Sequence, residues 1–230
     1  MNTPTRACGL LMIILSAGCV STKTVPLADK DLPKLNGSTL TYVSRERPDF
    51  GAMTAGKAMG VAFGAIGGAI AGGAMVSAGN HIVQENDIAD PANHMAQSLG
   101  ADLVTARSLS FKENNGTITK TNEPAELVKA YPGTDFLLDV RTYNWGFGYF
   151  PTSWSHYRVL YAARLQLLDS SNGKILAAGN CVRGPEKTSE GAPTYDELLA
   201  DHAARLKAEI AGAAEYCITE FKGKVLKLPL

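Results

Sequence analysis

Apolar side chains recur at helical spacing in two stretches of the chain. The first stretch follows Asp90, a hydrogen-bond acceptor, and predicts a helix from Pro91 to about Arg107. The second stretch begins at Thr194 with Glu197 three residues later, which is the pattern of a capping box. The apolar stripe of this long C-terminal helix consists of Leu199, Ala203, Leu206, Ile210, Ala213, Cys217 and Phe221.

Alternating apolar and polar side chains predict β-strands between these helices. The stronger strands are Asp135–Tyr143, Tyr157–Leu168 and Lys174–Val182, and the Asp169–Gly173 loop between the last two is typical of a hairpin. We therefore expect an antiparallel meander. Weaker signals predict strands at Leu40–Arg45 and Ser108–Lys112, a strand at Thr117–Lys120 that returns beside Ser108–Lys112, and a short helix at Pro124–Ala130.

This order of elements predicts an α+β fold, because an amphipathic helix must cover a sheet. The expected architecture is an antiparallel sheet packed by an N-terminal and a long C-terminal helix, with a glycine-rich helical segment inserted after the first strand. Over residues 38–226 the order loosely resembles the periplasmic α+β domains of the curli secretion-channel lipoprotein and of the lipoprotein that activates a penicillin-binding protein. This architectural resemblance implies binding rather than catalysis.

The first residues have the form of a secretory signal peptide. Arg6 lies in a short polar region, Gly9–Leu15 is an apolar run too short to cross a bilayer, and the small residues Ser16–Gly18 precede Cys19. This ending resembles the bacterial lipoprotein box, although serine stands where that box usually has leucine, and Leu15 lies one place further back. The resemblance implies that residues 1–18 are removed and that Cys19 is lipidated. An ordinary secreted protein that is cleaved nearby is the alternative.

The rest of the chain divides by composition. Residues 19–37 show no apolar period and are expected to form a lipidated tether. In lipoproteins of this kind, the absence of aspartate after Cys19 implies an outer-membrane location, here on the periplasmic side. We expect the first strand within residues 38–50, a glycine-zipper segment at 51–83 and an α+β periplasmic domain at 84–230.

Glycine recurs at every fourth position in the glycine-zipper segment. The five positions are Gly56, Gly60, Gly64, Gly68 and Gly72. In a helix they form a ridge without side chains, along which a second backbone can approach closely. The pattern resembles the glycine zippers of several bacterial outer-membrane lipoproteins, and residues 58–78 carry no charge. The ridge is expected to drive oligomerisation or membrane insertion; packing against its own domain is the alternative.

Two cysteines remain once Cys8 is removed with the signal peptide and Cys19 is lipidated. Cys181 and Cys217 then form an even set in an oxidising compartment, which predicts a disulfide between them. A pair of buried free thiols is the alternative. Neither cysteine belongs to a C-x-x-C pattern, so there is no signal for a metal or a redox enzyme.

Aromatic side chains are dense between Tyr143 and Tyr157. In a loop broken by glycine and proline, they are expected to form an exposed partner-binding patch or an interfacial anchor. The candidate partner-binding residues are Trp145, Phe147, Tyr149, Phe150 and Trp154. The alternative is a long hairpin whose tip folds over the sheet.

Charge and motifs narrow the function further. The chain has 22 basic and 22 acidic residues, so it has no broad field to attract nucleic acid. No catalytic motif is present, and the histidines have no ligand spacing: His81, His94, His156 and His202.

We therefore expect no metal, no cofactor and no enzymatic activity. The sequence favours an outer-membrane lipoprotein that binds an envelope protein partner as an adaptor or assembly factor. The main alternative is a membrane-inserting, pore-like homo-oligomer, and a third is an envelope hydrolase.

Overall fold

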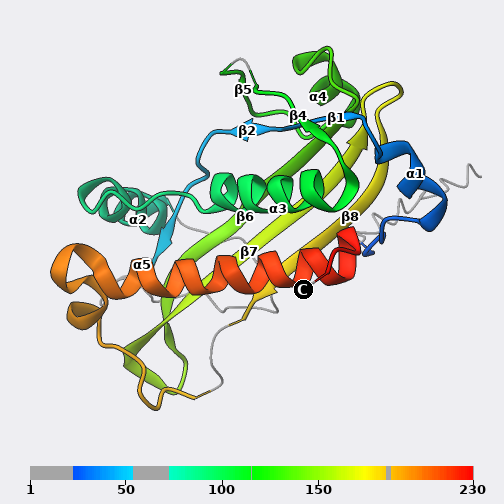
Figure 1. Cartoon of the computed structure of the whole chain (residues 1–230). Helices are drawn as coiled ribbons and strands as arrows, with labels where there is room; N and C mark the ends of the chain where they lie inside the picture. Colours follow the sequence, from blue (N-terminus) through cyan, green and yellow to red (C-terminus); the bar gives the residue numbers. More distant parts are fainter. Residues whose placement is uncertain (1–22, 54–72, 115, 185–187, 230) are drawn as a thin grey trace, which may run out of the picture.

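A mixed sheet with a long C-terminal helix packed across it forms the centre of the molecule (Figure 1). The computed structural model describes residues 23–53, 73–114, 116–184 and 188–229. Its three long strands, β6 (Phe136–Phe150), β7 (Ser153–Asp169) and β8 (Lys174–Arg183), pair antiparallel in chain order. The predicted α+β class and meander are confirmed.

The short strands add parallel pairs to this meander. The sheet order is β4-β1-β6-β7-β8, in which β1 (Thr39–Tyr42) lies parallel both to β6 and to β4 (Ser110–Phe111). β3 (Gly51–Ala52) lies parallel to the far half of β6. The sheet is therefore mixed rather than antiparallel throughout. Helical connections return the chain to the same end of the sheet before each of these pairs forms, which makes parallel pairing available.

Two further strands pair apart from the main sheet. β5 (Ile118–Thr119) lies parallel to β2 (Ser44–Arg45), which directly follows β1. The expectation that residues 117–120 return beside 108–112 is wrong. The turn signal at residues 114–116 marks a change of direction, but it does not specify which strand receives the chain afterwards.

Helices cover the two faces of the sheet unequally. α3 (Ala92–Arg107) and α5 (Tyr195–Glu220) lie side by side on one face, and α2 (Gly73–Glu85) packs at the end of that layer against β3 (Figure 1). α4 (Pro124–Ala130) lies on the other face, where its Leu127 joins a cluster with Leu137 and Leu168. The main core fills the space between the sheet and α3 and α5.

The C-terminal helix starts as predicted but is interrupted. Thr194 accepts the backbone N–H of Glu197, and the Glu197 carboxylate accepts that of Thr194, so the capping box is confirmed. The residues that follow Ala200 have φ angles of 51°, 54° and 57° at Asp201, His202 and Ala203. α5 is thus a short segment and a long one joined by a left-handed turn. A π-helix, Phe221–Leu226, continues it.

The expected tether at residues 19–37 is wrong for its second half. Val25 forms a β-bridge with Ala178, and the Leu27 N–H donates to the carbonyl of Val225 at 2.8 Å. A 3-10 turn at Asp29–Asp31 and α1 (Leu32–Leu35) follow, and both Leu27 and Leu35 are fully buried. Two buried leucines fix this segment without any apolar period in the sequence.

The end of the glycine-rich stretch packs inside the domain. A Cβ added to Gly79 in α2 would lie 2.0 Å from the Phe50 carbonyl oxygen and 2.9 Å from the Ala52 nitrogen. Helix and strand thus meet backbone to backbone. The signal peptide, Cys19 and the five ridge glycines (Gly56, Gly60, Gly64, Gly68 and Gly72) lie outside the described residues. Within the described ranges, no helix has the length and apolar character of a membrane span.

Candidate binding site

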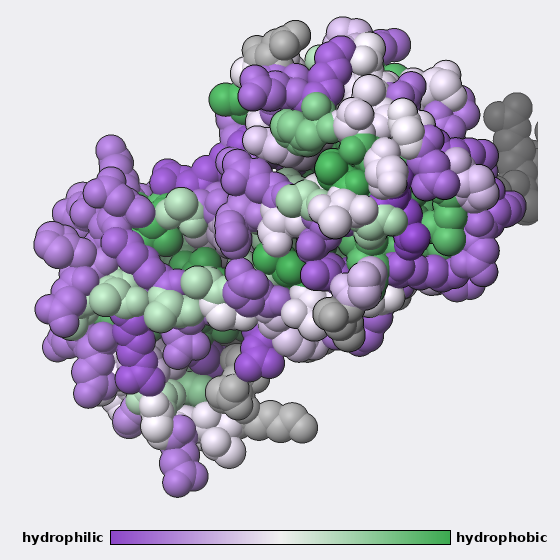
Figure 2. Space-filling model, in the orientation of Figure 1, coloured by the Kyte–Doolittle hydropathy of each residue, from purple (hydrophilic) through white to green (hydrophobic). Residues whose placement is uncertain are grey.

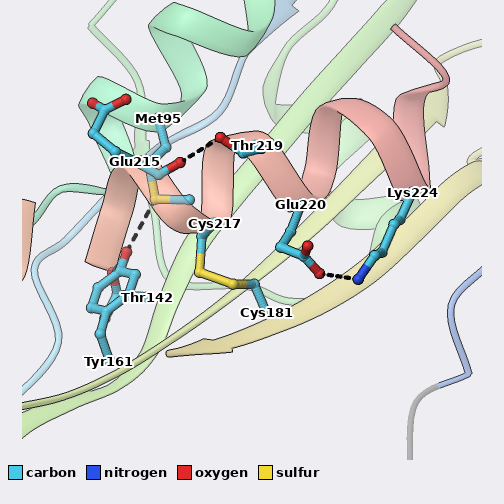
Figure 3. Close-up of a disulfide and its surroundings, with 9 residues drawn as sticks. All are labelled: Met95, Thr142, Tyr161, Cys181, Glu215, Cys217, Thr219, Glu220 and Lys224. Atoms are coloured by element: carbon cyan, nitrogen blue, oxygen red, sulfur yellow. Dashed lines mark hydrogen bonds and ion pairs between the residues drawn. A yellow bond between two sulfur atoms is a disulfide. The ribbon is translucent and has the colours of Figure 1, made fainter. Parts of the chain in front are cut away.

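The predicted disulfide is confirmed and fastens the helix layer to the sheet (Figure 3). Cys181 on β8 and Cys217 on α5 are bonded, with their Cα atoms 5.5 Å apart. Both cysteines are buried, and Phe221 of the apolar stripe is buried one helical turn further along the chain. The bond fixes α5 against the end of β8, where a groove opens between them.

The aromatic stretch is a long hairpin rather than a loop. β6 and β7 stay paired up to Phe150 and Ser153, so the two strands run through the whole stretch. Trp145, Phe147 and Phe150 are buried, and we correct the prediction that these three form an exposed patch. Their rings pack in the domain, where the Trp145 indole N–H donates to the Pro48 carbonyl at 3.2 Å.

Two of the five candidate aromatics remain accessible at the hairpin tip. Trp154 is 71% exposed and stacks on the half-buried Tyr149, with ring centroids 5.8 Å apart. Other exposed large hydrophobic side chains are scattered over the molecule, and the surface over α3 and α5 is mostly hydrophilic (Figure 2). A partner-binding role at this tip is therefore limited to one exposed ring and its neighbour.

A groove of about 430 Å³ lies between the base of this tip, the 188–193 loop and α5. Its floor is apolar, with the buried rings of Phe150 and Tyr157 and the side chains of Leu198 and Ala213. The Tyr157 N–H donates to the Pro193 carbonyl at 2.7 Å and holds the loop against β7. The groove has the apolar base and polar rim that are typical of a binding site.

Three arginines stand around the groove. Arg158 lies 5.2 Å from the Phe150 ring centroid, and burial lowers the pKa of its guanidinium. Arg183 stacks on Tyr216 at 5.1 Å, and Arg205 donates to the Gly191 carbonyl at 3.0 Å. Two carboxylates, Glu190 and Glu209, also line the groove. Among the described residues, the rim therefore carries both basic and acidic side chains.

The sequence analysis did not identify the arginines of this rim as functional residues. Arg158 follows the alternation of a predicted strand, and Arg183 comes directly after another. Each reads as an ordinary polar position in a strand. Pairing of β7 with β8 brings Arg158 and Arg183 to one end of the sheet, and the packing of α5, fastened by the disulfide, adds Arg205. Sequence spacing does not show this proximity.

A serine and a histidine contact each other at the hairpin tip, but no acid completes the set. Ser153 Oγ lies 2.7 Å from His156 Nδ1, and Ser155 Oγ lies 3.1 Å from the same nitrogen. No carboxylate in the described part of the chain is hydrogen-bonded to His156. The Glu197 carboxylate is engaged by Thr194 in the capping box, which lowers its pKa. A triad needs an acid that orients the histidine.

The other histidines are spread over the surface. His81 pairs with Glu85 on α2, and His94 pairs with Glu215 of α5, each at 3.1 Å. Among the described residues, no three His, Cys, Asp or Glu side chains are placed to hold a metal ion.

No protein-family model matches this chain, and no curated protein sequence matches it significantly. Among solved structures, the PelC dodecamer from Paraburkholderia phytofirmans is similar over 83% of this chain and 90% of that one, with 10% identity and a TM-score of 0.31. Lipoprotein GNA1162 from Neisseria meningitidis is 14% identical over 80% of this chain and 99% of that one, with a TM-score of 0.35.

Protein XCC0632 from Xanthomonas campestris, of the family DUF330, is 12% identical with a TM-score of 0.34, over 84% of each chain. At such TM-scores and identities, these likenesses place the chain in no family and carry no argument about its function.

Proposed function

We propose that this chain is a lipoprotein of the bacterial outer membrane that binds an envelope protein partner in the periplasm and catalyses no reaction. The observation that carries the proposal is the Cys181–Cys217 disulfide, because disulfides persist in oxidising compartments and are rare in the cytosol. It supports the export that the first residues predict.

The arginine-rimmed groove is the proposed partner site. It combines a buried apolar floor with the guanidinium groups of Arg158, Arg183 and Arg205. Arginine and aromatic side chains dominate the energetics of protein interfaces, and Trp154 is exposed at the tip of the hairpin whose base lines the groove. A polypeptide segment with acidic and apolar side chains has the chemistry that fits this rim and floor.

The test uses a photo-crosslinking amino acid in the full chain, expressed in a Gram-negative envelope. In place of Glu190, on the exposed lip of the groove, we expect a defined adduct with an envelope protein in the outer-membrane fraction. In place of Lys129, on the exposed side of α4 and on the opposite face of the sheet, we expect no such adduct.

Anchoring is measured in the same cells. Cys19→Ser should remove the chain from the membrane fraction, because acyl chains provide its attachment, whereas Cys8→Ser, within the predicted signal peptide, should leave the fractionation unchanged. A chain that stays in the membrane fraction after Cys19→Ser would contradict the anchor. Adducts of this chain with itself at position 190 would favour the homo-oligomer instead of the adaptor.

A further inference from the structure

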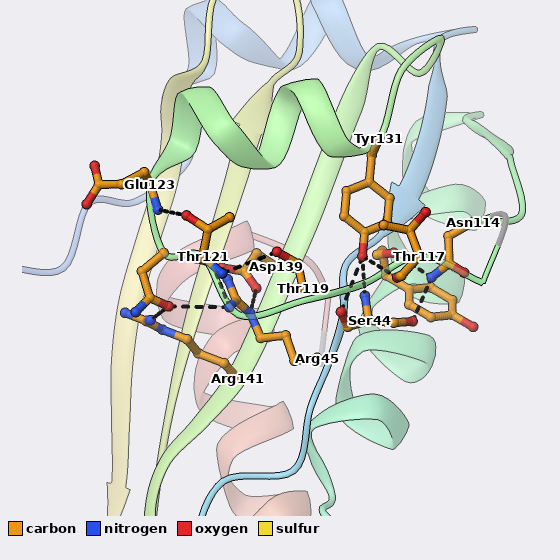
Figure 4. A network of polar contacts seen from close by, with 12 residues as sticks. Ser44, Arg45, Asn114, Thr117, Thr119, Thr121, Glu123, Tyr131, Asp139 and Arg141 are labelled. Atoms are coloured by element: carbon orange, nitrogen blue, oxygen red, sulfur yellow. Dashed lines mark hydrogen bonds and ion pairs between the residues drawn. The ribbon is translucent and has the colours of Figure 1, made fainter.

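On the sheet face opposite α5, arginine side chains gather around one buried carboxylate (Figure 4). Asp139 on β6 accepts two hydrogen bonds from Arg45, from Nε at 2.6 Å and from Nη2 at 2.8 Å. Because this bidentate pairing occupies both carboxylate oxygens, the charge of Asp139 is matched by Arg45.

Arg45 is held in this position by the segments around it. Its Nη1 donates to the Thr121 carbonyl at 2.8 Å. The neighbouring Ser44 N–H donates to the Tyr131 hydroxyl at 3.0 Å, and that hydroxyl donates to the Thr117 carbonyl at 2.7 Å (Figure 4). The network fixes β2 and β5 over the sheet. Arg45 and Asp139 therefore form a fixed ion pair.

Two more guanidinium groups lie on the same face, and within the described ranges neither forms an ion pair with a carboxylate. Arg141 follows Asp139 by two residues on β6, and Arg164 is its direct cross-strand partner on β7. The Nε atoms of both are buried, and neither has a hydrogen-bond partner in the described part of the chain. Like charges directly opposite each other destabilise a sheet, and unsatisfied buried donors are costly.

The environment of Arg141 shows the same excess of positive charge. Burial lowers the pKa of Arg141, and the positive charges of Arg45 and Arg164 act in the same direction, while Asp139 opposes them. Its Nη1 donates to the neutral side chain of Asn122. Among the described residues, three guanidinium groups, those of Arg45, Arg141 and Arg164, thus share the single negative charge of Asp139 on this face.

A groove of about 350 Å³ opens at this cluster. Its basic lining residues are Arg45, Arg47, Lys120 and Arg141. The two acids that line it are engaged: Glu46 pairs with Lys120 at 2.9 Å, and Asp90 accepts from Thr142 Oγ1 at 2.5 Å and from the Ala92 N–H at 3.0 Å. The groove is open to a ligand that brings negative charge.

We propose that this groove binds a phosphate group through Arg141, which lines it, and through Arg164, which stands directly beside Arg141 across the two strands, with Arg45 and Asp139 as the fixed base behind them. A phosphate group brings more acceptor oxygens than a carboxylate and up to two negative charges, so it matches two neighbouring guanidinium groups in both hydrogen bonds and charge. This site lies on the other face of the sheet from α5, and the proposal does not depend on the partner groove.

The experiment titrates inorganic phosphate into the full chain, purified in neutral detergent and phosphate-free buffer, and follows the thermal midpoint. We expect phosphate to raise the midpoint of the wild type, because a ligand of the native state stabilises it. Arg164→Gln should weaken phosphate affinity at least tenfold. Without phosphate, its midpoint should equal or exceed that of the wild type, because a like-charge contact is removed.

Two further variants distinguish specific phosphate binding from a general effect of positive charge and from an effect on folding. Lys129→Gln removes an exposed positive charge from α4 on the same face and should keep the full phosphate response. Arg141→Lys keeps the charge but loses the planar fork, and should bind phosphate more weakly than the wild type. An equal phosphate response in the wild type and Arg164→Gln, or no response in the wild type, would overturn the proposal.

A second titration distinguishes the sources of the phosphate. A larger shift with glycerophosphoglycerol, a soluble phosphodiester headgroup, than with inorganic phosphate assigns the site to a lipid headgroup. The reverse order assigns it to free phosphate or a phosphate monoester. Either order supports the site, provided that Arg164→Gln weakens the response at least tenfold.

Discussion

At the scale of single residues, Gly79 sets how closely α2 approaches the sheet. A methyl group there would overlap the backbone of Phe50 and Ala52, neither of which is a flexible side-chain end. We expect Gly79→Ala to lower the free energy of unfolding by about 1 to 3 kcal/mol, the usual cost of overpacking, in urea denaturation.

The matched control for this prediction is Gly212→Ala in α5. Its new Cβ meets nothing within 4 Å, so only helix propensity acts, and we expect stability to rise by about 0.5 to 1 kcal/mol. If both variants gained stability, the close contact between α2 and β3 would be contradicted.

Residue by residue, the sequence predicted the cysteine pair but not the positions of the aromatics. Once Cys8 is assigned to the signal peptide and Cys19 to the anchor, only Cys181 and Cys217 remain to pair, so the number of cysteines alone predicted this disulfide. The density of aromatics did not show that Trp145 and Phe147 face the core while Trp154 faces solvent. That choice depends on the strand register, which the turn at the hairpin tip sets.

At the scale of elements, the left-handed turn in α5 could not be predicted from the apolar periodicity, which continues through it. His202 has a φ of 54°, which costs a side-chain-bearing residue roughly 1 to 2 kcal/mol relative to right-handed helix. Because glycine adopts this conformation freely, we expect His202→Gly to raise the free energy of unfolding by up to about 1 kcal/mol.

Ala208→Gly, at an exposed position inside the long helical segment, serves as the comparison. There glycine should lower stability by about 1 kcal/mol, because it weakens a regular helix. Chemical denaturation of both variants measures the difference in sign. Losses of similar size in both would mean that α5 is helical throughout.

Local signals predicted the local elements. The capping box at Thr194 and the Pro124–Ala130 helix lie where the sequence places them, since each depends on neighbours within a few residues. The parallel pairing of β1 and of β3 with β6 depends on contacts between residues roughly a hundred positions apart. Two- to four-residue strands carry too little alternation to indicate a partner or a direction.

At the scale of the whole molecule, the disulfide joins the helix layer to the sheet across 36 residues. Closing a loop of this length restricts the unfolded chain, which corresponds to about 3 to 4 kcal/mol on the chain-entropy model. We expect reductant to lower the free energy of unfolding of the wild type by this amount, which is measured as a lower midpoint of guanidinium denaturation.

The Cys181→Ala, Cys217→Ala double variant should unfold at a lower denaturant concentration and show no response to reductant. Alkylation of two thiols in the unreduced, denatured wild type would contradict the bond. Comparing the effect of reductant on the wild type and on the double variant separates loss of the disulfide from other effects of reductant, because only the wild type has the cross-link.

The candidate sites belong to this largest scale. Each groove is assembled from segments far apart in the chain, such as β2 with β6, or β7 with α5. Arg141 and Arg164 are neighbours through strand register alone. A single sequence assigns such residues to strands but does not pair them, so it predicted the class of the fold and left the arginine clusters unrecognised.

The bridge from Val25 to Ala178 limits how far the domain can stand from a membrane. With Cys19 acylated as proposed, the six residues from there to Val25 span at most roughly 20 Å. The edge strand β8 is then held next to the lipid headgroups, and the tip of the β6–β7 hairpin, at the other end of the sheet, points away from the N-terminal segment (Figure 1). Such a geometry gives the protein a fixed near side and far side, so a partner would be met at a set height above the bilayer.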